Sequence, residues 1–367
     1  MCIYFVILLL IVLFPSSKRN LIICSEKPKK NRFNIIYFVF ISILLILIAG
    51  LRHQQVGYDL SHHYIDNFYK YNEMGWNQLS TFGVENALFI ISNLLAEFGL
   101  GIRSYIIVLS FLSIFPFLLF LYIESDSIKF TIFLFFCYCI FYQMMNQIQQ
   151  EIAVSFVLLG YLFLKRNKNI LFLIFILIAV TFHTSAIVCV SFYFLRRIKV
   201  NFNVLLFLVF TSIVLFIFFD HFINILCIIF PKYSWYKESI LHGKGDYSLG
   251  AFIRILLSLL IFLWSIIISI KRKNKENYYN FFVISSYLYF LSQLFTLKMI
   301  VTNRFGYYFL PFVLVLVEKN INVINQKSSK LLVYMSICVF MISYFSYITI
   351  MWGNESYGVV PYMFFWE

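Results

Sequence analysis

Runs of about twenty apolar residues, separated by short clusters of Lys and Arg, constrain this chain more than any other feature. Of its 367 residues, 62% are hydrophobic and 12% are charged, whereas soluble domains average about 25% charged residues. A soluble globule of this length could not bury so much apolar surface. The sequence therefore predicts an all-α polytopic membrane protein, and it argues against a soluble enzyme or a nucleic-acid-binding protein despite a net charge of +13.

We expect a single integral membrane domain over residues 1–367 with about twelve membrane-spanning helices and loops at the outer face. The first apolar run has no basic n-region and no small-residue cleavage site, so we interpret it as a helix and not as a signal peptide. The longer predicted spans are 33–51, 104–123, 201–219, 251–270, 278–297 and 331–350, and the shorter ones are 2–15, 130–145, 152–164, 170–182, 184–195 and 305–317.

The basic clusters predict the orientation, because Lys and Arg concentrate in inner loops. Six clusters hold 20 of the 29 basic residues, and twelve crossings with both termini outside place all six on the inner face. The segment 170–195 is short for two crossings, so a single longer helix that inverts the later topology is the alternative. Basic clusters at both of its ends favour a hairpin. The six clusters lie at 18–32, 129, 165–168, 196–199, 271–275 and 319–330.

Two outer loops, 52–86 and 220–250, are predicted to contribute to a site region. The first is rich in polar and aromatic residues, and a solvated loop with interfacial aromatics is the alternative interpretation. The adjacent His62 and His63 do not predict a metal site, since neighbouring His side chains rarely reach one ion, and no CxxC or HExxH spacing is present. The candidate residues of this loop are Arg52, Asp59, Tyr64 and Glu85.

Three further polar features stand near predicted membrane-spanning segments, where polar groups are costly unless they meet water or a ligand. Gln150 and Glu151 either cap a helix start or belong to a site. His183 lies at the outward apex of the short hairpin, so it is a candidate functional residue as well as a candidate core histidine. Arg304 and, more weakly, Arg254 either extend to the interface or bind phosphate through a planar guanidinium.

These features, in this order, resemble the EpsG family of polysaccharide polymerases, which is related in role to the Wzy polymerases. That family shows an Arg, a Gly-x-Asp-x-x-x-x-Tyr stretch, a Glu, an Arg-Gln-x-x-Ala helix start, a Phe-His-x-Ser segment and a late Arg before aromatics. The resemblance extends over residues 35 to 315, and one departure is Gln149 at the position of the family Arg. The matching residues are Arg52, Gly57, Asp59, Tyr64, Glu85, Gln150, Ala153, Phe182, His183, Ser185, Arg304, Tyr307 and Tyr308.

The resemblance implies a bacterial inner-membrane glycosyltransferase that joins undecaprenyl-diphosphate-linked oligosaccharide repeat units at the outer face. We expect no cofactor and no metal, since arginines can neutralise a diphosphate. Candidate protein partners are a chain-length regulator and a flippase. The expected roles are diphosphate binding by Arg52, Arg304 and Arg254, proton transfer by His183 with Asp59 and Glu85 as rivals, and sugar binding by Gln150, Tyr64, Tyr307 and Tyr308.

Two other functions are compatible with a chain of this kind. A transporter or flippase of lipid-linked oligosaccharide is the main alternative, although we find no internal repeat, and only 13 Gly and 6 Pro to break helices. A membrane acyltransferase built around His183 would need an acyl donor from the inner side, and the predicted outer position of His183 argues against it.

Overall fold

The computed structural model describes residues 1–15, 32–229, 234, 244–271 and 277–367, and within these ranges the chain is helical with no strand. The predicted all-α class is therefore confirmed. The described residues divide into two compact units, Met1–Val190 with Ile321–Glu367 (unit 1) and Ser191–Asn320 (unit 2). Residues 230–233 and 235–243 of the predicted outer loop 220–250 lie outside the described residues, as do most residues of two basic clusters, 18–32 and 271–275.

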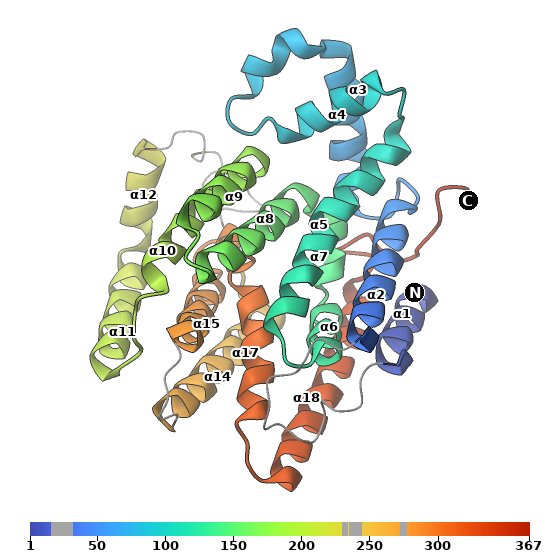
Figure 1. Ribbon diagram of the computed structural model, residues 1–367. Helices are drawn as coiled ribbons and strands as arrows, with labels where there is room; N and C mark the ends of the chain where they lie inside the picture. The colour runs from blue at the N-terminus through green and yellow to red at the C-terminus, as the bar shows by residue number, and fades with distance from the viewer. Residues whose placement is uncertain (16–31, 230–233, 235–243, 272–276) are drawn as a thin grey trace. The chain divides into compact units, whose positions relative to one another are not determined.

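Unit 1 contains the amino-terminal helices and the last helix of the chain (Figure 1). Between α2 and α5 the predicted outer loop 52–86 is mostly helical, with a π-helical turn η2 and a 3₁₀ turn η3 beside α3. The elements are α1 (Cys2–Leu13), α2 (Arg32–Gly50), η2 (Leu60–Ile65), α3 (Asp66–Met74), η3 (Trp76–Phe82), α4 (Ala87–Glu97), α5 (Ile102–Glu124), α6 (Ile128–Cys137), α7 (Ile140–Asn146), α8 (Ile148–Lys165), α9 (Asn169–Phe182), η4 (Thr184–Ser191), α18 (Lys327–Tyr347) and η7 (Ile348–Trp352).

Unit 2 is built around α14 and α15, which pack against each other and are followed by two short helical turns. Aromatic rings fill its interior, as where the Phe192 ring lies 5.2 Å from that of Phe281. The elements are α10 (Phe192–Leu195), α11 (Phe202–Ile217), α12 (Phe219–Ile229), α14 (Leu249–Lys271), α15 (Asn277–Phe295), η6 (Ile300–Thr302), α16 (Asn303–Gly306) and α17 (Leu310–Asn322), whose last two residues belong to unit 1.

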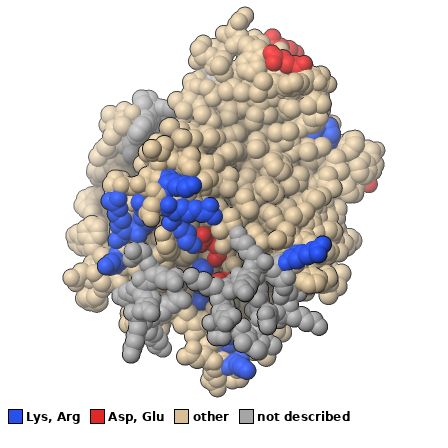
Figure 2. All heavy atoms as spheres, in the orientation of Figure 1, with Lys and Arg blue, Asp and Glu red and all other residues tan. Residues whose placement is uncertain are grey.

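Five helices of the described chain are long and apolar enough to cross a membrane, and the number rises to eight if each of three bent helix pairs forms one span. The chain is thus a polytopic membrane protein, while the exact count of twelve crossings stays a prediction. On the face shown in Figure 2, uncharged side chains dominate and charged residues appear only in small groups. The five helices are Arg32–Gly50, Ile102–Glu124, Ile148–Lys165, Leu249–Ile270 and Lys327–Trp352.

Several predicted spans are interrupted where the sequence suggested continuous helices. The predicted span 130–145 bends by 59° between α6 and α7, because Cys139 adopts a left-handed backbone conformation with φ 60°. Similar breaks separate α11 from α12 and α16 from α17. The segment 170–195, by contrast, divides where the sequence predicts, at His183, whose backbone is extended (φ −148°, ψ 118°), into two short apolar helices. Whether these two helices form a hairpin stays a prediction.

The predicted inner ends of several unit 1 helices meet at one place. Lys165 at the end of α8 makes a 2.8 Å ion pair with Glu124 at the end of α5. Lys129 at the start of α6 donates to the Phe14 carbonyl after α1, at 3.2 Å. These contacts join helix ends that the basic clusters assign to one side of the membrane, and the inner position of that side stays a prediction.

The carboxy-terminal tail, residues 353–367, lies against the segment that follows α2. His53 donates its backbone N–H to the Met363 carbonyl at 2.9 Å, and Gly57 donates to the Gly358 carbonyl at 2.8 Å. The last fifteen residues therefore help to fix the backbone that carries several of the predicted site residues.

Close packing of α8 on α9 yields the first prediction. A Cβ atom on Gly160 would lie 3.1 Å from the Phe175 Cβ and 3.4 Å from the Phe172 carbonyl oxygen. Gly160→Leu should therefore overpack this contact and lower the free energy of unfolding by about 1–3 kcal/mol, measured by thermal unfolding in detergent. Gly101→Leu is the matched control, since nothing lies within 4 Å of a Cβ there. Equal effects of the two substitutions would contradict the packing account.

Candidate functional site

His183 and Glu85, 98 positions apart in the sequence, are brought together in unit 1. The Glu85 carboxylate Oε1 accepts hydrogen bonds at 2.7 Å from both the backbone N–H and the hydroxyl of Thr184. The same oxygen lies 3.6 Å from His183 Nδ1, and the two side chains are 22% and 20% exposed. Two of the predicted proton-transfer candidates thus form one partly accessible carboxylate–imidazole pair.

The local backbone explains why the two side chains meet. Glu85 stands just before α4, and the break after α9 exposes the N–H groups that begin η4. Because unpaired N–H groups at a helix start attract an anion, the carboxylate binds there and holds His183 beside it. Ser185 adds a further contact, with its hydroxyl oxygen 3.4 Å from His183 Nδ1.

Gln149 connects the start of α8 with this pair, although the sequence singled it out only as a departure from the family pattern. Its side-chain amide donates to the Phe182 carbonyl at 2.6 Å, one residue before His183. Its backbone N–H donates to the Tyr64 hydroxyl at 3.0 Å. Gln149 therefore positions the end of α9, and Tyr64, a predicted sugar ligand, is buried and holds α8.

Arg52 is completely buried, which the sequence did not indicate. Its two terminal nitrogens donate to the backbone carbonyls of Ala49 at 2.7 Å and Met145 at 2.9 Å. Burial lowers the pKa of Arg52 to about 10, so the guanidinium remains protonated near neutral pH. In this geometry Arg52 joins the end of α2 to the end of α7, and its predicted role in diphosphate binding stays a prediction.

Position 57, beside the contact of Arg52 with the Met145 carbonyl, requires a glycine. Its φ is +95°, and a Cβ atom would lie 2.9 Å from the Met145 carbonyl oxygen that Arg52 also contacts. The next residue, Tyr58, donates its backbone N–H to the Asn146 side chain at 2.8 Å. Asp59 follows as an exposed residue at the start of η2. The segment after Arg52 is thus a fixed turn against α7, and Asp59 is at its surface.

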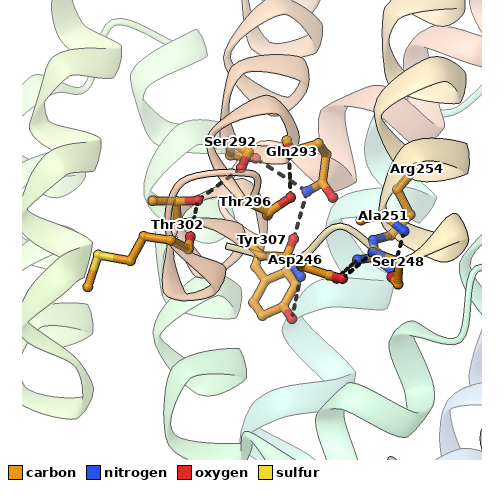
Figure 3. Close-up of polar contacts among 11 residues, drawn as sticks. Asp246, Ser248, Ala251, Arg254, Ser292, Gln293, Thr296, Thr302 and Tyr307 are labelled. Atoms are coloured by element: carbon orange, nitrogen blue, oxygen red, sulfur yellow. Dashed lines mark hydrogen bonds and ion pairs between the residues drawn. The ribbon is translucent and has the colours of Figure 1, made fainter. Parts of the chain in front are cut away.

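Unit 2 holds a second polar cluster that the sequence found only in part (Figure 3). Arg254 makes a 3.0 Å ion pair with Asp246, whose other oxygen accepts the Ser248 N–H at 2.9 Å. Burial raises the pKa of Asp246, but the hydrogen bonds from Ser248 and the charge of Arg254 outweigh it and hold the pKa below its usual range. Arg254 was predicted as a site residue, whereas Asp246 and Ser248 were not.

The same unit joins Gln293 of α15 to the turn that carries Arg304. The Gln293 amide donates to the Asn303 side chain at 2.6 Å, and Asn303 lies 3.4 Å from the Tyr307 hydroxyl. Arg304 follows Asn303 and is partly exposed. Tyr307 and Tyr308 are both buried, so their predicted contact with sugar stays a prediction.

Metal ligands were not expected at these sites. Among the described residues, no group of three or more His, Cys, Asp and Glu side chains is placed to hold a metal ion. Of the adjacent histidines, His63 Nδ1 lies 3.3 Å from the Asn67 amide. Independence of metal stays a prediction about the reaction.

Fold and site together define a helical polytopic membrane protein with polar residues gathered where its helices end or break. The chain belongs to the EpsG family, whose model matches residues 35–364. The match confirms the resemblance seen in the sequence, and it supports a polymerase-type function in polysaccharide biosynthesis. Neither the curated proteins nor the solved structures contain a match to this chain.

The burial of Arg52 yields a prediction that distinguishes a structural role of this side chain from direct contact with the substrate. Arg52→Met should leave two buried carbonyl oxygens without donors and lower the free energy of unfolding by about 2–4 kcal/mol, measured by thermal unfolding. Arg166→Met, at an exposed position, is the control and should change stability by less than about 0.5 kcal/mol. Unchanged stability of Arg52→Met together with lost activity would instead favour direct contact with the substrate.

Proposed function

We propose that this chain is a glycosyltransferase that polymerises oligosaccharide repeat units carried on undecaprenyl diphosphate, at the outer face of the bacterial inner membrane. The Glu85–His183 pair is the observation that carries the proposal. It places a partly exposed imidazole beside a carboxylate, in a family of polysaccharide polymerases. The products would be O-antigen, capsule or exopolysaccharide.

The reaction transfers the growing glycan from one carrier to the non-reducing end of the next lipid-linked unit. The acceptor hydroxyl oxygen attacks the anomeric carbon of the growing glycan and forms the new glycosidic bond. The bond between that carbon and the diphosphate oxygen breaks, and the bonding electrons leave with the carrier diphosphate. A base must take the hydroxyl proton, and cationic groups must stabilise the charge of the leaving group.

We assign the proton to His183. Its Nδ1 faces Glu85 at 3.6 Å, so Nε2 is the ring nitrogen directed away from the carboxylate and would accept the proton. The Glu85 carboxylate would stabilise the imidazolium that results, as an acid beside a histidine does in other acid–base pairs. Thr184 keeps the carboxylate in place through its two hydrogen bonds.

We assign the diphosphate to the arginines of unit 2. Arg304 is partly exposed and stands on a turn fixed by Gln293 and Asn303. The Arg254 guanidinium makes an ion pair with the Asp246 carboxylate at 3.0 Å. This ion pair orients the guanidinium and neutralises part of its charge. A planar guanidinium matches phosphate oxygens in a bidentate manner, so the leaving group can be stabilised without a metal ion.

Replacing these residues tests the function. His183→Ala and Arg304→Ala, at equal protein level, should each lower polymer formation by at least about 100-fold and leave single repeat units on the carrier. His62→Ala, at an exposed position, is the control and should make normal polymer. The measurement is the length distribution of surface glycan by gel electrophoresis.

Two outcomes would contradict the proposal. Normal-length polymer from both variants would remove His183 and Arg304 from the reaction. Accumulation of repeat units on the inner leaflet in a deletion strain, with none outside, would indicate a flippase in place of a polymerase.

A further inference from the structure

The first turn of α8 contains a buried carboxyl group that the mechanism does not use. Glu151 is 1% exposed, and among the described residues its Oε1 has no hydrogen-bond partner. By contrast Glu124, the buried carboxylate at the other end of the same helix pair, is paired with Lys165 at 2.8 Å. An unpaired carboxyl at membrane depth is costly and marks a functional position by default.

Two glutamines that precede Glu151 in the chain also carry buried acceptor oxygens. Gln143 and Gln147 precede Glu151 by eight and four positions, and backbone hydrogen bonds of 2.7 Å and 3.0 Å link the three residues in succession. The side-chain Oε1 atoms of both glutamines are also buried, with no partner in the described part of the chain. Native proteins leave few buried polar groups unsatisfied, so three in succession need an explanation.

The position of Glu151 follows from its neighbours on α8. Ser155, one helical turn further, donates its hydroxyl to the Ser113 carbonyl of α5 at 2.5 Å, so this face of α8 is directed toward α5. Gln149, two residues earlier, is directed instead toward the end of α9 and His183. Glu151 therefore lies on α8 within one turn of Gln149, which positions the Glu85–His183 pair, while Gln147 directly precedes α8 and Gln143 belongs to α7.

The chemistry of these oxygens restricts what they can bind. A carboxylate and amide oxygens accept hydrogen bonds, so their ligand must present several donors. A diphosphate presents acceptors and negative charge, and it would be repelled. The hydroxyl groups of a sugar are donors without charge, and they fit.

We propose that Glu151, with Gln147 and Gln143, forms a subsite that binds hydroxyl groups of the acceptor sugar. The inference rests on the proposed function and adds a binding residue to it. The subsite holds the acceptor close to His183 and makes no contact with the diphosphate. The carboxyl group is retained for binding, at a cost to the stability of the protein.

The test compares two substitutions at Glu151 with a matched control. Glu151→Leu removes both carboxyl oxygens, whereas Glu151→Gln keeps an acceptor oxygen. Glu124→Leu removes a carboxyl that is equally buried but paired. Each variant is purified in detergent, and its binding of the free oligosaccharide released by mild acid from the lipid-linked repeat unit is measured by equilibrium dialysis. Thermal unfolding is measured on the same samples.

We expect Glu151→Leu to weaken oligosaccharide binding by about tenfold, the loss typical of one or two hydrogen bonds. Its midpoint of unfolding should rise by about 2–4 °C, because an unsatisfied buried group is replaced by an apolar one. Glu151→Gln should bind within about threefold of wild type. Glu124→Leu should bind normally and unfold at a lower temperature. His183→Ala should bind normally and fail to polymerise.

Other results would overturn the inference. Normal oligosaccharide binding by Glu151→Leu, with polymerisation by the wild type intact, would show that water alone meets these oxygens and would leave the proposed function standing. A lowered unfolding midpoint in Glu151→Leu would show a structural role. If the wild type neither binds the oligosaccharide nor polymerises lipid-linked units, the proposed function fails and the subsite fails with it.

Discussion

The Glu85 carboxylate is the contact on which the arrangement of the site depends. A helix that breaks inside a membrane protein leaves N–H groups that must be satisfied by protein, water or ligand. Glu85 meets this need by accepting the backbone N–H of Thr184 at 2.7 Å, and the same oxygen also accepts the Thr184 hydroxyl at 2.7 Å. The break after α9 is thereby stabilised, and His183 stands at its centre next to a negative charge. The requirement to satisfy the backbone and the requirement to orient a base are met by the same side chain.

The other polar contacts of unit 1 support this one from the surrounding helices. The Gln149 side chain donates a hydrogen bond to the carbonyl of the residue before His183, and the Tyr64 hydroxyl accepts the backbone N–H of Gln149. Arg52 joins α2 to α7 from a fully buried position, and the carboxy-terminal tail lies against the segment that follows it. Most of these side chains satisfy backbone groups, while Glu151 stands apart as a buried carboxyl that satisfies none in the described chain.

The sequence was sufficient to predict the helical membrane fold, because long apolar runs predict membrane-spanning helices and basic clusters predict the loops between them. It also indicated Glu85 and His183 as candidates, since polar groups near membrane spans are costly unless they meet water, protein or a ligand, and the structure brings these two side chains together. It did not indicate that Arg52 donates hydrogen bonds to backbone carbonyls. Every residue carries a backbone carbonyl, so such a partner cannot be recognised from the residue type. The contact of the tail with residues 51–58 was equally invisible, since it is made largely by backbone atoms. The break at Cys139 was not predicted, because it depends on a left-handed backbone conformation of one residue, which local hydropathy does not reveal.

The central claim is that this chain joins lipid-linked repeat units, and reconstitution tests it most directly. The purified wild-type chain would be placed in liposomes with undecaprenyl-diphosphate-linked repeat units from a strain that lacks it, and the glycans would be analysed by mass spectrometry. The account predicts a ladder of products whose masses differ by one repeat unit, with release of undecaprenyl diphosphate. Recovery of single repeat units alone, with folded protein in the membrane, would contradict it.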